Sequence, residues 1–304
     1  MNQIDTVWTL ATAFVNNAKL VTISDAKISE VAKDIVEWKQ DCDPPSWNFP
    51  KGIKSTDLRP FQKLFLYELI ANSVNYCYWY GRHYIRHNGA SSTKMYGLLD
   101  KSFDHLERMK ESASFHPHSE LEIIINTFID GLSKARFPLI DRRVEHLNEL
   151  LNRSDLLSVI EISVSRKDYS VENWLDYIIT SFPGYSKDLF LKRAFLFIMQ
   201  MYRRCGIFEK EISKVFVPAD YQVPKMLRWL GCIEYSSELA WIVDGNMLMI
   251  EDCSMECEIR AATIVTCKRI ADLAECTCEE VDNYLWSQRH ICTEPFHLCR
   301  TSNY

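Results

Sequence analysis

Six residues of this chain, 75–80, form an aromatic run in which four rings fall within five positions. Flat aromatic faces stack on heterocyclic bases, so the run could bind a purine-like ligand. The candidates for such contacts are Asn75, Tyr76, Tyr78 and Trp79. The alternative is that these rings fill the core between helices, because aromatic side chains dominate protein cores generally.

A second segment places an acidic residue between two prolines. Asp220 lies between Pro218 and Pro224, just ahead of a short helical pattern that ends near Gly231. A catalytic carboxylate needs rigid positioning, which makes Asp220 a candidate for chemistry. The alternative is that Asp220 only caps the helix that contains Pro224, as Asp often does.

Two adjacent cations, Lys192 and Arg193, follow a turn at residues 181–185 and begin a very apolar helical pattern. A Lys–Arg pair can clamp a phosphate, and Arg can do so with two parallel hydrogen bonds. Adjacent residues lie about 100° apart on a helix, so at most one of the two normally faces inward. The alternative is therefore a solvated helix face.

Arg260, at the start of another helical pattern, and His297, in the C-terminal tail, are further candidates that could simply pack. Cysteine and histidine are dense near this end of the chain, but their spacings form no standard paired-ligand pattern for zinc. No phosphate-cradling Gly-rich loop and no H-E-x-x-H motif occurs. We expect no metal at this site, and we expect the eleven cysteines to be reduced thiols.

The composition bounds the class of protein. The 304 residues are 47% apolar and 25% charged, which is globular composition and excludes disordered and fibrous classes. No apolar run is long enough to span a membrane, and residues 1–20 lack the pattern of a signal peptide, so we expect a soluble, cytoplasmic protein. A formal net charge of −6 without a block of Lys or Arg argues against direct nucleic-acid binding, but a small anionic ligand needs only one or two cations.

The spacing of the apolar residues predicts a mainly α protein, because they recur at three and four positions and only 9 of 304 residues are Gly. Prolines in residues 41–60 predict a long ordered loop instead of a helix. Thr277 and Glu280 have the spacing of a capping box. We expect one domain over residues 1–304, with a possible N-terminal subdomain at 1–115. Helices are predicted over residues 24–39, 60–75, 94–110, 119–132, 139–153, 155–163, 171–182, 187–204, 223–230, 256–274 and 278–288.

In this order, the segments resemble those of the queuosine salvage protein family, the queuosine 5′-phosphate N-glycosylases that release the base queuine from its nucleotide. The resemblance covers roughly residue 60 to the C-terminus. It rests on Asn75-Tyr76-x-Tyr78-Trp79, Phe137-Pro138-Leu139-Ile140 with Asn148, Ser181-Phe182-Pro183-x-Tyr185, Lys192-Arg193-Ala194, Ala219-Asp220-Tyr221-x-x-Pro224 with Leu230-Gly231, Glu258-Ile259-Arg260, Tyr284-Leu285-Trp286 and Pro295-Phe296-His297.

The resemblance implies an all-α fold similar to that of helix-hairpin-helix DNA glycosylases, and a hydrolysis without redox cofactor that salvages a nucleobase for tRNA modification. It implies a small-molecule substrate, a modified purine nucleoside 5′-monophosphate. Cleavage of an N-glycosidic bond builds positive charge on the ribose, so a fixed carboxylate can stabilise that charge or activate water. Asp220 would be this carboxylate.

The same resemblance distributes the other roles. Tyr76, Tyr78 or Trp79 would stack on the base, and Tyr221 would add another face or a hydrogen bond. Lys192 or Arg193 would hold the 5′-phosphate, while Arg260 and His297 would support the pocket or contact the phosphate.

Two alternatives stay open at this point. One is the same chemistry on another modified 7-deazapurine nucleotide, which turnover alone would distinguish. The other is a non-catalytic protein that binds a nucleotide or base, for which binding would occur without product. A glycosylase acting on duplex DNA is disfavoured by the acidic charge of the chain.

Overall fold

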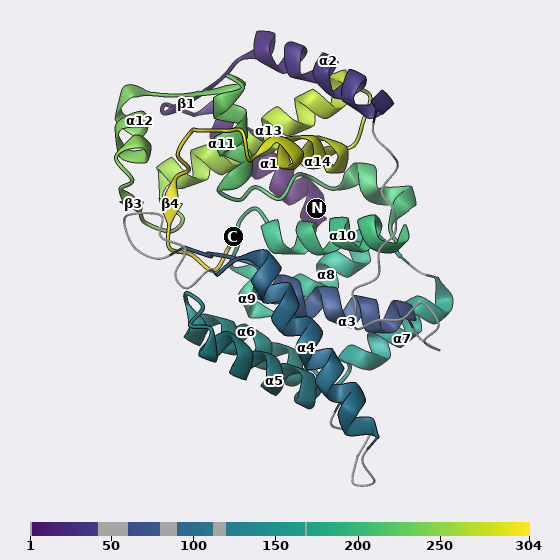
Figure 1. Cartoon of the computed structure of the whole chain (residues 1–304). Helices are drawn as coiled ribbons and strands as arrows, with labels where there is room; N and C mark the ends of the chain where they lie inside the picture. The colour runs from purple at the N-terminus through teal and green to yellow at the C-terminus, as the bar shows by residue number, and fades with distance from the viewer. Residues whose placement is uncertain (1, 42–59, 80–89, 112–119, 168) are drawn as a thin grey trace.

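The computed structural model describes residues 2–41, 60–79, 90–111, 120–167 and 169–304 (Figure 1). It contains 69% helix and only 4% strand, which confirms the predicted all-α class. The described helices are α1 (Gln3–Asn16), α2 (Asp25–Asp41), α3 (Pro60–Ser73), α4 (Ser92–Lys110), α5 (Glu120–Lys134), α6 (Ile140–Leu151), α7 (Leu156–Arg166), α8 (Val171–Ser181), α9 (Pro183–Ser186), α10 (Lys192–Cys205), the 3₁₀ helix η3 (Glu209–Lys214), α11 (Gln222–Trp229), α12 (Ser237–Asp244), α13 (Ser254–Leu273) and α14 (Cys278–Gln288).

Most predicted helices are found within a few residues of their predicted bounds. The capping box is confirmed: the Thr277 side chain accepts from Glu280 N at 3.2 Å, and the Glu280 carboxylate accepts from Thr277 N at 2.8 Å. The predicted helix at 187–204 is wrong at its start, because Leu191 has a φ of 51° and α10 begins only at Lys192. Helices α1 and α12 were not predicted, and the loop predicted at 41–60 falls almost wholly outside the described residues.

Among the described residues, four short strands depart from a purely helical fold. Strand β1 (Val21–Ile23) pairs antiparallel with β2 (Ile233–Tyr235), and β3 (Leu248–Met249) pairs parallel with β4 (Leu298–Cys299). Each pair joins segments that are far apart in sequence. The two strand pairs therefore connect distant parts of the helical fold, and they do not form a sheet layer.

The helices form two halves that meet along α10 (Figure 1). Helices α3 to α9 make one half, and α1, α2 and α11 to α14 make the other. The second half combines N-terminal and C-terminal parts of the chain, since α1 and α2 pack on α13. The Glu258 carboxylate on α13 also accepts from Lys19 N at 3.0 Å and Leu20 N at 2.8 Å. The division of the chain near residue 115 stays a prediction.

The core runs through α3, α10 and α13, which are buried on most of their sides. Every residue of α3 from Leu64 onward is buried, as its dense apolar sequence predicts. The ten described cysteines are all free thiols. Within the described ranges, no helix combines the length and the apolar character that crossing a membrane requires.

Candidate active site

A cavity of about 320 Å³ lies where the two halves meet, a volume suited to a small-molecule ligand. Its lining comes from the segment after α3, the start of α4, one side each of α10 and α14, the start of α11 and the C-terminal segment. The sequence-predicted residues that line it are Asn75, Tyr76, Tyr78, Trp79, Lys192, Asp220 and Tyr221.

Asp220 is both a helix cap and a cavity residue. Its Oδ1 accepts hydrogen bonds from Gln222 N at 2.7 Å and Val223 N at 3.2 Å, at the start of α11. The capping alternative is therefore correct for one oxygen, while Oδ2 accepts no hydrogen bond from the described residues. Burial raises the pKa of the Asp220 carboxyl, and the nearby charge of Lys192 and the two N–H donors oppose that rise.

Lys192 is the buried cation whose charge most lowers the pKa of Asp220. Its Nζ donates to the Asn75 carbonyl at 2.9 Å, and its main-chain N donates to Asp188 Oδ2 at 2.7 Å. Burial lowers the pKa of the Lys192 ammonium to about 8, although the charge of Asp220 opposes the change. Lys192 thus contacts the backbone of the aromatic segment directly and influences Asp220 through its charge.

Four aromatic rings line one region of the cavity. The Tyr221 ring lies 4.5 Å from Phe296 and 6.4 Å from Tyr304, and Phe296 lies 6.5 Å from Trp79, all between centroids. Phe296 and Tyr304 were not among the predicted site residues. The Pro-Phe-His block does mark this segment, but it is the Phe of that block that reaches the cavity.

His297, the candidate chosen from that block, lies behind the wall. Its Nε2 is 3.0 Å from the Tyr304 hydroxyl, so the histidine contacts a lining residue without lining the cavity itself. Burial and the charge of Arg260 lower the pKa of His297 to about 3, which keeps the imidazole neutral.

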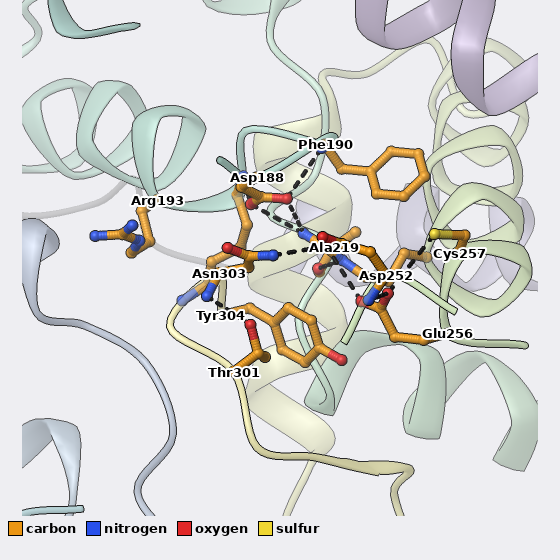
Figure 2. A network of polar contacts seen from close by, with 12 residues as sticks. Asp188, Phe190, Arg193, Ala219, Asp252, Glu256, Cys257, Thr301, Asn303 and Tyr304 are labelled. Carbon is orange, nitrogen blue, oxygen red and sulfur yellow. Dashed lines mark hydrogen bonds and ion pairs between the residues drawn. The ribbon is translucent and has the colours of Figure 1, made fainter. Parts of the chain in front are cut away.

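Arg260 is also buried and does not line the cavity. It contacts the segments that carry Lys192 and Asp220, and its partners Asp188 and Ala219 lie near each other in Figure 2. Its guanidinium donates from Nε to the Ala219 carbonyl at 2.9 Å, next to Asp220, and pairs with Asp188 at 2.8 Å. Asp188 in turn accepts from the N-terminal amide of α10, the helix that begins with Lys192. Arg260 therefore sets the position of two segments relative to each other.

Arg193, the neighbour of Lys192, does not line the cavity. Its Nη1 donates to the Ser73 carbonyl at 2.6 Å, its Nη2 donates to the Gly184 carbonyl, and its side chain points away from the Asp188 carboxylate in Figure 2. Of the two cations considered for a phosphate, only Lys192 faces the cavity, as the angular spacing of adjacent helix residues predicts.

A second carboxylate, which was not predicted, also lines the cavity. Asp282 on α14 lines it and pairs with Arg203 Nη2 at 2.8 Å. The negative charge of Asp282 is one of the causes that raise the pKa of Asp220. The helix was predicted, but nothing in its local pattern marks which of its acidic residues faces inward.

Comparison with known proteins decides the family. The sequence pattern described as queuosine salvage protein matches residues 57–304, most of the chain. The chain belongs to the queuosine salvage protein family. This family membership agrees with the motifs from residue 60 onward.

Several relatives in the family carry the name queuosine 5′-phosphate N-glycosylase/hydrolase. The mouse protein is 26% identical over 230 residues, covering 67% of this chain and 66% of the relative, so the match spans about two thirds of its length. The Dictyostelium discoideum protein is 25% identical over 245 residues, covering 73% and 71%. The Sphaerobacter thermophilus protein is 23% identical over 325 residues, covering 98% and 97%.

Proposed function

We propose that this protein is a hydrolase that cleaves the N-glycosidic bond of queuosine 5′-monophosphate and releases queuine. The observation that carries the proposal is the Asp220 carboxylate, held by two backbone amides on a cavity that aromatic rings and Lys192 also line. The names of the relatives support the substrate.

Asp220 is the proposed catalytic residue. As the base leaves, positive charge develops on the ribose, and an ionised carboxylate beside it lowers the energy of the transition state or activates water. The two amides at Oδ1 fix the orientation of the carboxyl group, which leaves Oδ2 for the substrate. Lys192 and these amides favour the ionised form against the effect of burial.

The other lining residues supply binding. We propose that the base stacks among Trp79, Tyr221 and Phe296, whose rings lie within 4.5–6.5 Å of their neighbours. The Lys192 ammonium has three donors, of which one goes to Asn75 O. The remaining donors are available for the 5′-phosphate of the nucleotide.

The fold proposal goes with the function. We propose that the helical architecture is similar to that of helix-hairpin-helix DNA glycosylases. The substrate here would be a single nucleotide in place of DNA. The net charge of −6 supports a small substrate over duplex DNA.

The test is a comparison of three substrates with purified protein, in which mass spectrometry follows the free base. We expect queuine from queuosine 5′-monophosphate, slower release from the nucleoside, and no guanine from GMP. Release from no substrate, by protein that is folded by circular dichroism, would contradict the proposal. Queuine binding without turnover would then favour a binding protein, and turnover of another 7-deazapurine nucleotide would change only the base.

A further inference from the structure

Arg143 on α6 is a fully buried cation with no carboxylate partner in the part of the chain that the structure describes. Its neighbour Arg142 is exposed and pairs with Glu145 at 3.1 Å. A buried charge is costly unless its hydrogen-bonding groups are satisfied. The partners of Arg143 therefore identify what it does.

The hydrogen bonds of Arg143 go to backbone carbonyls. Its Nε donates to Pro138 O at 2.8 Å, within its own region of the chain. Its Nη2 donates to Tyr76 O at 2.5 Å and to Cys77 O at 2.9 Å. Its Nη1 donates to Val74 O. One guanidinium thus holds three carbonyls of the segment that follows α3.

That segment, residues 74–79, is buried and has no regular secondary structure. A buried irregular segment needs a partner for each carbonyl, because an unpaired one costs free energy. Lys192 donates a hydrogen bond to the Asn75 carbonyl, and Arg193 donates one to the Ser73 carbonyl. Three buried cations therefore cover the five successive carbonyls 73–77, and Arg143 covers most of them.

The same guanidinium contacts the side chains of the segment. Its central carbon lies 4.4 Å from the Tyr76 ring centroid and 5.5 Å from that of Tyr78. Cys77 has a φ of 36°, a conformation that a residue other than Gly keeps only when its surroundings fix it. The Cys77 amide donates to Tyr304 O at 3.0 Å, so this turn is held from both sides.

We propose that Arg143 is a positioning residue that sets the cavity wall at residues 75–79 before the base binds, a role that rests on the proposed function. Arg143 does not line the cavity and acts through the backbone of this wall. A wall that is ordered in advance spares the ligand the cost of ordering it. Loss of the clamp therefore weakens binding of base and substrate, and leaves the chemistry at Asp220 nearly intact.

The test is Arg143→Lys, with Arg142→Lys on the exposed face of the same helix as the matched control. Lysine keeps the charge but lacks the planar fork that reaches three carbonyls. We expect the KM for queuosine 5′-monophosphate and the Kd for queuine to rise together on the order of tenfold, the effect of one lost charged hydrogen bond. We expect kcat to stay within about threefold and the control to match the wild type.

Folded Arg143→Lys protein with wild-type KM and Kd would overturn the proposal. A fall in kcat at unchanged KM would also overturn it, because the effect would then lie in the chemistry. Absence of turnover by the wild type counts against the proposed function instead, and the Kd for queuine then decides the role of Arg143.

A measurement on the wild type covers the case in which the variant does not fold. Hydrogen exchange of peptides that contain residues 74–79 reports whether the wall is ordered without ligand. We expect slow exchange in the free protein and little change when queuine is added. Fast exchange that slows strongly on addition of queuine would show that the ligand orders the wall, and would overturn the proposal.

Discussion

At the scale of the residue, the site depends on one carboxylate and one ammonium that influence each other. The charge of Lys192 opposes the burial that raises the pKa of Asp220, and the charge of Asp220 opposes the burial that lowers the pKa of Lys192 to about 8. Each charge therefore offsets part of the effect of burial on the other group. Under the proposed mechanism, the active form has an ionised Asp220 and a protonated Lys192, so the rate depends on pH in two directions.

We expect kcat/KM to rise with pH as Asp220 ionises, and to fall as pH passes about 8 and Lys192 loses its proton. Lys192→Met should remove the fall near pH 8. It should also move the rising limb to higher pH, because Asp220 loses the cation that favours its ionised form. Rates from pH 5 to 9 with both proteins check this.

A Lys192→Met profile with the wild-type fall near pH 8 would assign that limb to another group.

The sequence predicts Asp220 and the cation pair, because both lie in recognisable local patterns. It does not predict which cation faces the cavity, since that choice follows from the start of α10, which the left-handed Leu191 and the Asp188 cap determine.

At the scale of the element, Arg260 on α13 fastens the α10 and α11 segments to each other. It is buried, and it pairs with Asp188 at 2.8 Å and with Glu256 at 3.4 Å. Glu256 lies on the same helix, whereas Asp188 precedes α10, so the ion pairs connect α13 to the segment that leads into α10 (Figure 2). Breaking this network leaves two buried carboxylates without their cation.

We expect Arg260→Met to lower the free energy of unfolding by about 3–5 kcal/mol, the usual effect of removing one partner from a buried ion pair. The matched control is Arg269→Met on the same helix, where Arg269 pairs with Asp25 on the surface at 3.0 Å. That change should cost at most about 1 kcal/mol. Urea unfolding of both variants measures the difference, and equal losses would contradict the structural role of Arg260.

The element scale also shows where local sequence patterns are sufficient. Apolar spacing locates α3 and α14, and the capping box fixes the start of α14 at Thr277. Local patterns do not predict the roles of Asp282 and Arg143, because each acts on residues 60 or more positions away. Asp282 influences Asp220, and Arg143 holds residues 74–77. Their roles need the tertiary structure.

At the scale of the whole molecule, the cavity exists because two helical halves meet, and buried histidines stand near that junction. Burial and arginine charges lower the pKa of both His297 and His146 to about 3. In the unfolded chain both would titrate near 6.5. The unfolded state therefore binds more protons than the folded state between about pH 3 and 6.5, and folding stability falls as pH decreases through this window.

We expect each of these histidines to cost on the order of 2 kcal/mol of stability at pH 5 relative to pH 7.5. His297→Gln removes one of the two titrations, so this variant should lose less stability over that range than the wild type. His290→Gln, the same substitution at an exposed position, is the control. Denaturant unfolding at several pH values measures the free energy of unfolding of each protein. The same pH dependence of this free energy in His297→Gln and in the wild type would contradict the role given to His297.

The central claim, that Asp220 is the catalytic carboxylate and more than a helix cap, is tested most directly by comparing Asp220→Asn with Asp220→Ala. Asparagine keeps an oxygen for the amides of Gln222 and Val223, so Asp220→Asn should fold with nearly wild-type stability, whereas the alanine variant should lose about 1 kcal/mol. We predict that queuine release from queuosine 5′-monophosphate falls on the order of 10²–10³ in kcat in both variants. Turnover by Asp220→Asn within about tenfold of the wild type would show that Asp220 serves only as a cap, and would contradict the mechanism.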